Sequence, residues 1–209
     1  MSDKTPAYRY FVVYKPYGML SQFSREHEGQ SVLADLHYDF PGDVYPVGRL
    51  DADSEGLLLL TNDKTLNARL LHPRYQHVRT YWVQVEGIPE EKDLLPMRQG
   101  MELRIDGKFF RTRPALVDLL PVPPDLPERY PPVRYRKTVP DTWLSVTLTE
   151  GKNRQVRRMC AAAGYPVLRL VRVQIGSVIW GTAPIGSLQP GQVCVLRSPA
   201  LLLKQVGGH

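Results

Sequence analysis

Apolar and polar residues alternate along several short stretches of the chain, which is the pattern of strands buried on one face. The alternation is clearest over 79–86, where Tyr81, Val83 and Val85 fall on one side and Trp82, Gln84 and Glu86 on the other. Other strands are expected at 10–14, 44–50, 57–61, 143–149 and 167–179, and residues 103–118 should form two or three more.

Helices are expected where apolar residues recur at helical spacing between capping and terminating residues. Asp63 can cap a helix that ends near His72, a second helix would begin at Pro89 and end at Gly100, and a third over 153–163 would end at Gly164. A short helix over 31–36, capped by Ser31, and a last helical turn after Ser198 complete the set. Strands outnumber helices without regular alternation, so the fold class is α+β with a mixed, mostly antiparallel central sheet flanked by helices.

The chain length fits one folded unit, and 209 residues with 43% hydrophobic and 23% charged side chains indicate a single globular domain over 1–209. Residues 121–132 contain six prolines and are expected to form a loop or extended insert. Two cysteines without a CxxC motif fit a reducing compartment, and no apolar leader or membrane span is visible. We therefore expect a cytoplasmic protein.

Positive charge is concentrated at the end of the sequence. The net charge is +6, and residues 151–209 carry eight Lys and Arg but no Asp or Glu. Such asymmetry favours a polyanion-binding surface built largely by this last quarter, with nucleic acid as the partner. A solvated basic face without a partner is the ordinary alternative.

Three carboxylates, Asp51, Asp53 and Glu55, lie within five residues between two apolar runs. Clustered carboxylates repel one another, so basic groups are expected to face them. A capped, solvated turn is the ordinary explanation. An EF-hand calcium loop fits poorly, because its twelfth position is Asn62 where a bidentate Glu is required.

The segment GRLDADSEGLLLLTND (48–63) closely resembles the signature of the RsuA-like pseudouridine synthases. The resemblance implies that Asp51 is the essential catalytic carboxylate of an enzyme that isomerises a uridine in ribosomal RNA. It also implies a bi-lobed catalytic fold, with two lobes sharing one sheet, and no cofactor or metal.

Three more segments resemble motifs of this family in the same order, namely Lys15–Gly18, 79–87 (RTYWVQVEG) and 150–159 (EGKNRQVRRM). The resemblance implies that Tyr81 stacks on the target uracil and that Arg157 contacts the catalytic carboxylate. Without it, Tyr81 would be interpreted as a core residue of a strand, and the arginines as a solvated helix face. Asn153 is the expected N-cap of this helix. The candidates for contacts with RNA are Lys15, Arg49, Lys152, Arg154 and Arg158.

The resemblance extends over about 10–179 and is strongest to the large-subunit pseudouridine synthase E type, which implies 23S rRNA as substrate. Many relatives carry an S4 RNA-binding domain before the catalytic domain, whereas here about nine residues precede the first strand. RNA selection is therefore expected to rest on the catalytic domain, and nothing demands more than a monomer. The alternatives are a non-catalytic rRNA-binding or ribosome-assembly factor on the same fold, and a metal-dependent hydrolase that uses the 51–55 carboxylates.

Overall fold

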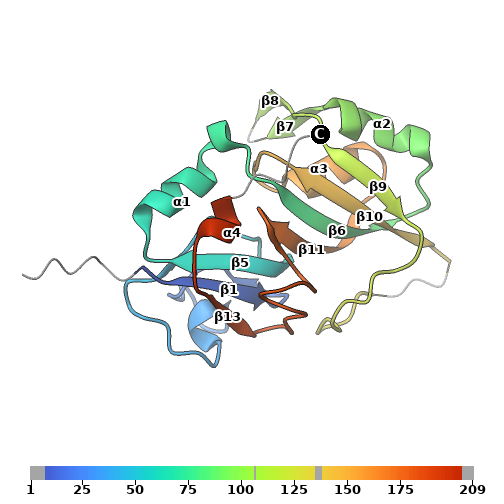
Figure 1. Ribbon diagram of the computed structural model, residues 1–209. Helices are drawn as coiled ribbons and strands as arrows, with labels where there is room; N and C mark the ends of the chain where they lie inside the picture. The colour runs from blue at the N-terminus through green and yellow to red at the C-terminus, as the bar shows by residue number, and fades with distance from the viewer. Residues whose placement is uncertain (1–7, 106, 135–137, 204–209) are drawn as a thin grey trace, which may run out of the picture.

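A nine-stranded mixed sheet forms the centre of the molecule in a computed structural model, which describes residues 8–105, 107–134 and 138–203 (Figure 1). Along the sheet the strands are β13 (Val193–Leu196), β1 (Tyr10–Lys15), β5 (Glu55–Thr61), β11 (Val167–Ile175), β6 (Arg79–Glu86), β10 (Asp141–Leu148) and β9 (Leu116–Leu120). Two short strands join this path, β4 (Tyr45–Pro46) beside β5 and β12 (Val178–Ile179) beside β11.

All neighbours in this sheet are antiparallel except β5 and β11, which pair in parallel. Two small sheets lie apart from it, made by β2 (Met19–Leu20) with β3 (Ser31–Val32) and by β7 (Glu102–Ile105) with β8 (Lys108–Arg111). The helices are α1 (Lys64–Leu71), α2 (Glu91–Gln99), α3 (Gln155–Ala162) and α4 (Ala200–Leu203), with 3-10 turns η1 (Leu33–Asp35) and η2 (Pro73–Tyr75). The expected α+β class with a mostly antiparallel sheet is confirmed.

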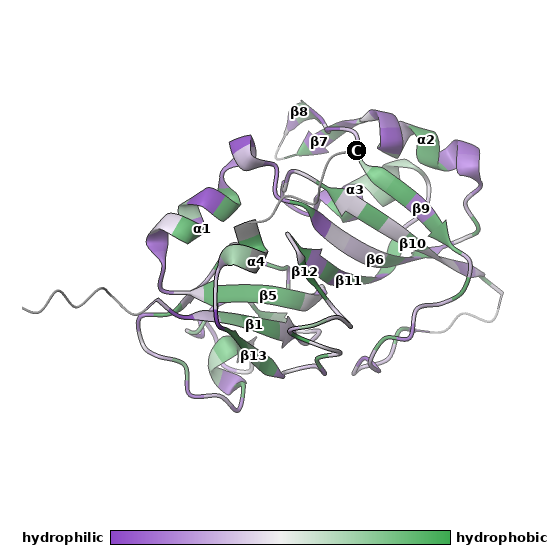
Figure 2. Ribbon diagram, in the orientation of Figure 1, coloured by the Kyte–Doolittle hydropathy of each residue, from purple (hydrophilic) through white to green (hydrophobic). Residues whose placement is uncertain are grey.

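Strands β1 and β5 are buried on both faces, which explains their uninterrupted apolar sequences. Val12 and Leu59 enter a core with residues of β11, while Val13 and Leu58 enter a second core on the opposite face. Figure 2 shows both strands as almost continuously hydrophobic. A third core joins β6, β9 and β10 to α2 and α3.

Two of the expected helices, α1 and α2, form where the capping and terminating residues indicated. The Asp63 carboxylate accepts a hydrogen bond from the Leu66 backbone N–H at the start of α1, and Gly100 ends α2 with a positive φ of 85°. The proline-rich residues 121–132 contain no helix or strand, as expected.

Three elements differ from the sequence prediction. Ser31 is not a helix cap but lies in β3, where it pairs with Met19 of β2. The Asp35 carboxylate instead accepts a hydrogen bond from the Val32 N–H at the start of η1. The predicted strand over 44–50 shortens to β4, because Gly48 takes a positive φ of 68° and turns the chain.

The predicted strand over 167–179 is a hairpin. Gly176 has a φ of 57°, and β12 folds back onto the end of β11 there. Strand β13 was not predicted at all. Among the described residues, no helix has both the length and the apolar character needed to cross a bilayer.

Candidate active site

The loop between Leu50 and Glu55 is held in place by backbone contacts on both sides. The Ser21 hydroxyl donates to the Leu50 carbonyl at 2.9 Å and accepts from the Leu50 N–H at 3.0 Å. The Gly18 N–H donates to the Ala52 carbonyl at 2.7 Å. The turn after β1 and Ser21, which directly follows β2, therefore fix the backbone from which Asp51 projects.

Lys15 also contacts the backbone of this loop, through a hydrogen bond to Ala52. Its side chain is fully buried, and its ammonium donates to the carbonyls of Pro16, Met19 and Ala52 at 2.9, 2.7 and 3.4 Å. Burial lowers the pKa of Lys15 to about 8, although the nearby charge of Glu55 acts in the opposite direction. The sequence prediction that Lys15 contacts RNA is therefore corrected, because its three donors are already used inside the protein.

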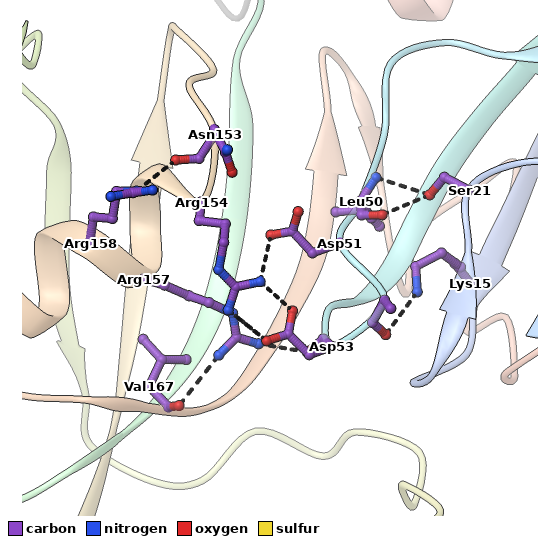
Figure 3. A network of polar contacts seen from close by, with 11 residues as sticks. Lys15, Ser21, Leu50, Asp51, Asp53, Asn153, Arg154, Arg157, Arg158 and Val167 are labelled. Atoms are coloured by element: carbon purple, nitrogen blue, oxygen red, sulfur yellow. Dashed lines mark hydrogen bonds and ion pairs between the residues drawn. The ribbon is translucent and has the colours of Figure 1, made fainter. Parts of the chain in front are cut away.

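Two guanidinium groups from the start of α3 face the carboxylates of this loop (Figure 3). Arg154 forms two hydrogen bonds with the Asp53 carboxylate, at 3.0 and 2.8 Å, and its Nη1 lies 3.4 Å from Asp51 Oδ2. Arg157 donates to the Asp53 carbonyl at 2.6 Å, and its Nε lies 3.4 Å from Asp53 Oδ2. The expected guanidinium beside Asp51 is thus Arg154, and Arg157 is bound to Asp53.

The guanidinium groups set the charge of Asp53. Burial alone would raise the pKa of this carboxyl, but the hydrogen bonds from Arg154 and the positive charges of Arg157 and Arg154 outweigh burial, and the pKa lies below its ordinary value. Asp53 is therefore ionised at neutral pH and orients Arg154, which reaches Asp51 with the same guanidinium.

The helix start that presents these arginines differs from the expected cap. Arg154, not Asn153, is the N-cap, with left-handed backbone angles φ 52° and ψ 33° and no side-chain cap hydrogen bond. The Asn153 carbonyl instead accepts from Arg158, whose guanidinium also donates to the Arg104 carbonyl. In Figure 3 Arg158 points away from the acidic loop, so it does not contact the carboxylates, and its contact with RNA stays a prediction.

A cavity of about 590 Å³ opens beside Asp51. Five of the eight site residues expected from the sequence line it, namely Arg49, Asp51, Tyr81, Lys152 and Arg154. Lys152 lies with its ammonium 4.7 Å from the centre of the Phe110 ring, and Arg49 is exposed. The cavity thus collects side chains from four separate parts of the sequence, within the size range of small-ligand sites.

Tyr81 and Arg172 stand side by side in the cavity wall. The register of the sheet pairs Arg172 with Tyr81 on β6 and with Gly56 on β5. Arg172 is 5% exposed, donates through Nε to the Leu57 carbonyl at 2.7 Å, and has a buried Nη2 without a hydrogen-bond partner. No carboxylate of the described residues lies within ion-pair distance of Arg172, and burying a guanidinium in this way costs free energy.

Comparison with known proteins agrees with this geometry. Residues 9–162 match the model of a protein family described as RNA pseudouridylate synthase. The chain belongs to the RNA pseudouridylate synthase family.

The similar members of this family include enzymes of bacterial ribosomes. The chain is 56% identical over 163 residues to "Ribosomal large subunit pseudouridine synthase E" of Xanthomonas axonopodis pv. citri, covering 78% of this chain and 83% of that protein. It is 51% identical over 178 residues to the protein of the same name from Vibrio parahaemolyticus, covering 85% and 69%. A crystal structure of a pseudouridylate synthase superposes with a TM-score of 0.73 at 28% identity, covering 93% and 72%.

Glu55, the third carboxylate of the acidic loop, is bound inside the sheet and does not line the cavity. Glu55 is 1% exposed and receives two hydrogen bonds from Arg169, at 2.9 and 2.8 Å, so this pair joins β5 to β11. The three carboxylates of the loop are therefore each matched by a guanidinium. Among the described residues, no group of three or more His, Cys, Asp or Glu side chains is arranged to hold a metal ion.

Sequence reasoning missed Ser21 and Arg172 and misjudged Lys15. A signal for Arg172 was present, because LRLVRVQI (168–175) places two arginines inside an apolar strand. Basic residues in a buried strand must be paired or functional. Nothing in the sequence around Ser21 indicated its contact with Leu50, since the two are 29 residues apart.

Proposed function

We propose that this protein isomerises a specific uridine of large-subunit 23S ribosomal RNA to pseudouridine, with Asp51 as the catalytic carboxylate. The observation that carries the proposal is the convergence of Asp51, Arg154 and Tyr81 on one cavity, from three distant parts of a chain of this family. The relatives named for the large ribosomal subunit support this choice of substrate. A ribosomal RNA substrate also leads us to propose that the enzyme acts in the cytoplasm.

The reaction breaks the bond between uracil N1 and ribose C1′ and forms a bond between C5 and C1′. The proton on C5 is lost and N1 gains one, so the product is an isomer of the substrate. The uridine must first leave its stack, which costs a few kcal/mol. Stacking on Tyr81 offsets part of this cost, since base–aromatic stacking contributes about 1–3 kcal/mol per base.

Asp51 acts on the ribose of the unstacked nucleotide, by attack at C1′ or by removal of a proton from the sugar. Both routes require an ionised carboxylate, and the guanidinium of Arg154 lies 3.4 Å from Asp51 Oδ2 as a neighbouring positive charge. The detached uracil is electron-rich, and the guanidinium of Arg172 beside Tyr81 favours such a species in the cavity. Cavity walls prevent the detached base from escaping before it rotates.

The decisive experiment compares Asp51→Asn with the wild-type protein on a 23S rRNA fragment and in cells that lack the gene. The amide keeps the size of the side chain but cannot act as a nucleophile or base. We expect pseudouridine formation to fall by at least about 10³-fold, while RNA affinity and the thermal midpoint stay close to wild type. Asp43→Asn, an exposed carboxylate that accepts from Asn62, is the matched control and should retain full activity.

Two outcomes would contradict the proposal. Turnover by Asp51→Asn at the wild-type rate would remove Asp51 from the reaction. A wild-type protein that binds rRNA without forming pseudouridine, and whose gene deletion leaves the pseudouridine map of rRNA unchanged, would be a non-catalytic ribosome-assembly factor.

A further inference from the structure

The basic end of the sequence contributes little free charge to the surface of the molecule. Within 151–197 the structure gives most arginines an internal partner. Arg154 and Arg157 contact the acidic loop, Arg169 pairs with Glu55, Arg158 donates to two carbonyls, and Arg172 is buried. The sequence expectation that this segment forms the RNA-binding surface is therefore not supported by its contacts.

A different segment presents unpaired positive charge, namely residues 64–79, which run from α1 through η2 to the first residue of β6 (Figure 1). We call it the α1–η2 arm. It contains four Lys and Arg, two His and no Asp or Glu. Lys64, Arg69 and Arg74 are exposed, and no carboxylate of the described residues lies within ion-pair distance of them.

The aromatic ring of Tyr75 holds two of these charges in fixed positions. The guanidinium carbon of Arg69 lies 5.4 Å from the ring centre, and that of Arg74 lies 5.9 Å from it. Cation–π contacts of this kind orient a guanidinium while leaving its N–H groups available for an anion.

The arm also forms one rim of the cavity beside Asp51. Leu71, His72 and Pro73 line the cavity from this side, and residues 151–154 line it from the other. His77 lies in the same wall, is 6% exposed, and has an Nε2 atom without a hydrogen-bond partner. Burial and the charges of Arg79 and Arg69 lower the pKa of His77, so its ring is neutral at pH 7.

We propose that the α1–η2 arm binds the rRNA strand that adjoins the target uridine, with Arg69 and Arg74 paired to backbone phosphates. This inference rests on the proposed function. A uridine placed at Asp51 has its neighbouring phosphates at the rim of the cavity, where unpaired guanidinium groups are the strongest partners available.

The test is the double variant Arg69→Gln/Arg74→Gln, which keeps most of both stems and removes two charges. Neutralising one phosphate contributes about 0.7–0.9 to the slope of log Kd against log salt, so this slope should fall by about 1.4–1.8. At 150 mM salt, KM for a 23S rRNA fragment should rise roughly tenfold while kcat stays within twofold of wild type. Binding is measured by filter retention at several salt concentrations, and the thermal midpoint verifies folding.

The matched control is Arg9→Gln/Arg197→Gln, which removes two exposed arginines at the β1–β13 edge, away from the cavity lining. It should leave the salt slope and KM unchanged. A wild-type slope and KM in the arm variant would overturn the proposal, and so would an equal loss in the control. Failure of the proposed function is a separate result, because it appears as wild-type protein without pseudouridine formation, whereas the salt slope is measured on binding alone.

Discussion

The charge state of the acidic loop depends on individual side chains from the start of α3. Arg154 contacts the carboxylates of both Asp51 and Asp53, whereas Arg157 contacts the loop through the Asp53 carbonyl and carboxylate. The Arg154 side chain is 41% exposed and that of Arg157 is 13% exposed. Arg154 is therefore the group whose removal changes electrostatics with least damage to packing.

Replacing Arg154 by Ala should make stability less dependent on pH in the acid range. The pKa of Asp53 is below its ordinary value, so its ionised form stabilises the fold above the unfolded pKa of about 3.9, and this contribution is lost as pH falls through the folded pKa. Without Arg154 the folded pKa moves back toward the ordinary value. We expect wild type to resist urea better than Arg154→Ala at pH 6, and the two urea midpoints to converge as pH falls from 5 to 3.

The exposed arginine at position 197 provides the comparison for this measurement. Arg197→Ala should follow wild type at every pH, because no described carboxylate lies within ion-pair distance of Arg197. A gap between wild type and Arg154→Ala that stayed constant from pH 6 to pH 3 would mean that Arg154 stabilises the loop by packing rather than by charge.

The sequence indicated which residues gather near the acidic loop, but it did not indicate which side chains form the individual contacts. It placed Asp51, Tyr81 and an arginine at one site, because three separate segments that resemble family motifs, 48–63, 79–87 and 150–159, carry them. It did not predict that Arg154 rather than Arg157 reaches Asp51, since that depends on the left-handed backbone of Arg154 at the helix start. Lys15 was misjudged for a similar reason, because its burial results from the loop that folds over it.

At the scale of secondary structure, the parallel pairing of β5 with β11 positions the acidic loop next to the cavity. The pairing joins Val171 to Glu55 and Arg172 to Gly56, immediately after the loop ends. Gly56 has a positive φ of 100°, and a Cβ atom there would lie 2.3 Å from the Arg172 carbonyl oxygen. Only glycine allows the two strands to approach this closely.

Gly56→Ala should therefore be among the most destabilising single substitutions in the chain. The added methyl group meets backbone that cannot rotate away, and the β5–β11 pairing must open. We expect a loss of at least about 3 kcal/mol in the free energy of unfolding, measured by urea denaturation. Gly107→Ala is the control that separates backbone strain at positive φ from the steric clash with Arg172. Gly107 also has a positive φ, but no atom lies within 4 Å of an added Cβ. It should cost about 1–2 kcal/mol, and equal losses in both variants would refute the collision.

Long periodic elements were predictable from sequence, and short edge elements were not. Helices α1 and α2 begin and end near residues that cap or terminate helices, and β6 shows clear alternation. Strand β13 has only four residues and pairs with β1 alone among the described strands, so no second neighbour shapes its sequence pattern. The hairpin of β11 and β12 turns at Gly176, where its N–H donates to Val78, a contact between distant segments.

For the whole molecule, β11 is the strand that connects the two sides of the sheet. Val171, Val173 and Ile175 of this strand belong to the core around β1 and β5, whereas Leu170 belongs to the core around β6 and β10. Because β11 contributes side chains to both cores, the loss of β11 from one core also removes its side chains from the other core and exposes apolar residues there. We therefore propose that residues 8–203 unfold as one cooperative unit, in keeping with the single domain expected from the sequence.

The three tryptophans of the chain allow this cooperativity to be measured. Trp82 and Trp180 form an edge-to-face pair, with ring centres 6.0 Å apart, packed against the core around β1 and β5, while Trp143 is buried in β10, a strand that contributes to the core around β6 and β10. In Trp143→Phe, the remaining fluorescence comes from Trp82 and Trp180 and reports the core around β1 and β5. In Trp82→Phe/Trp180→Phe, it comes from Trp143 and reports β10. If the sheet unfolds in one step, fluorescence and far-UV circular dichroism should give the same urea midpoint within each variant. Fluorescence that changes at clearly lower urea than circular dichroism in either variant would show that β11 does not couple the two cores, and the site between them would then be assembled from two independently stable parts.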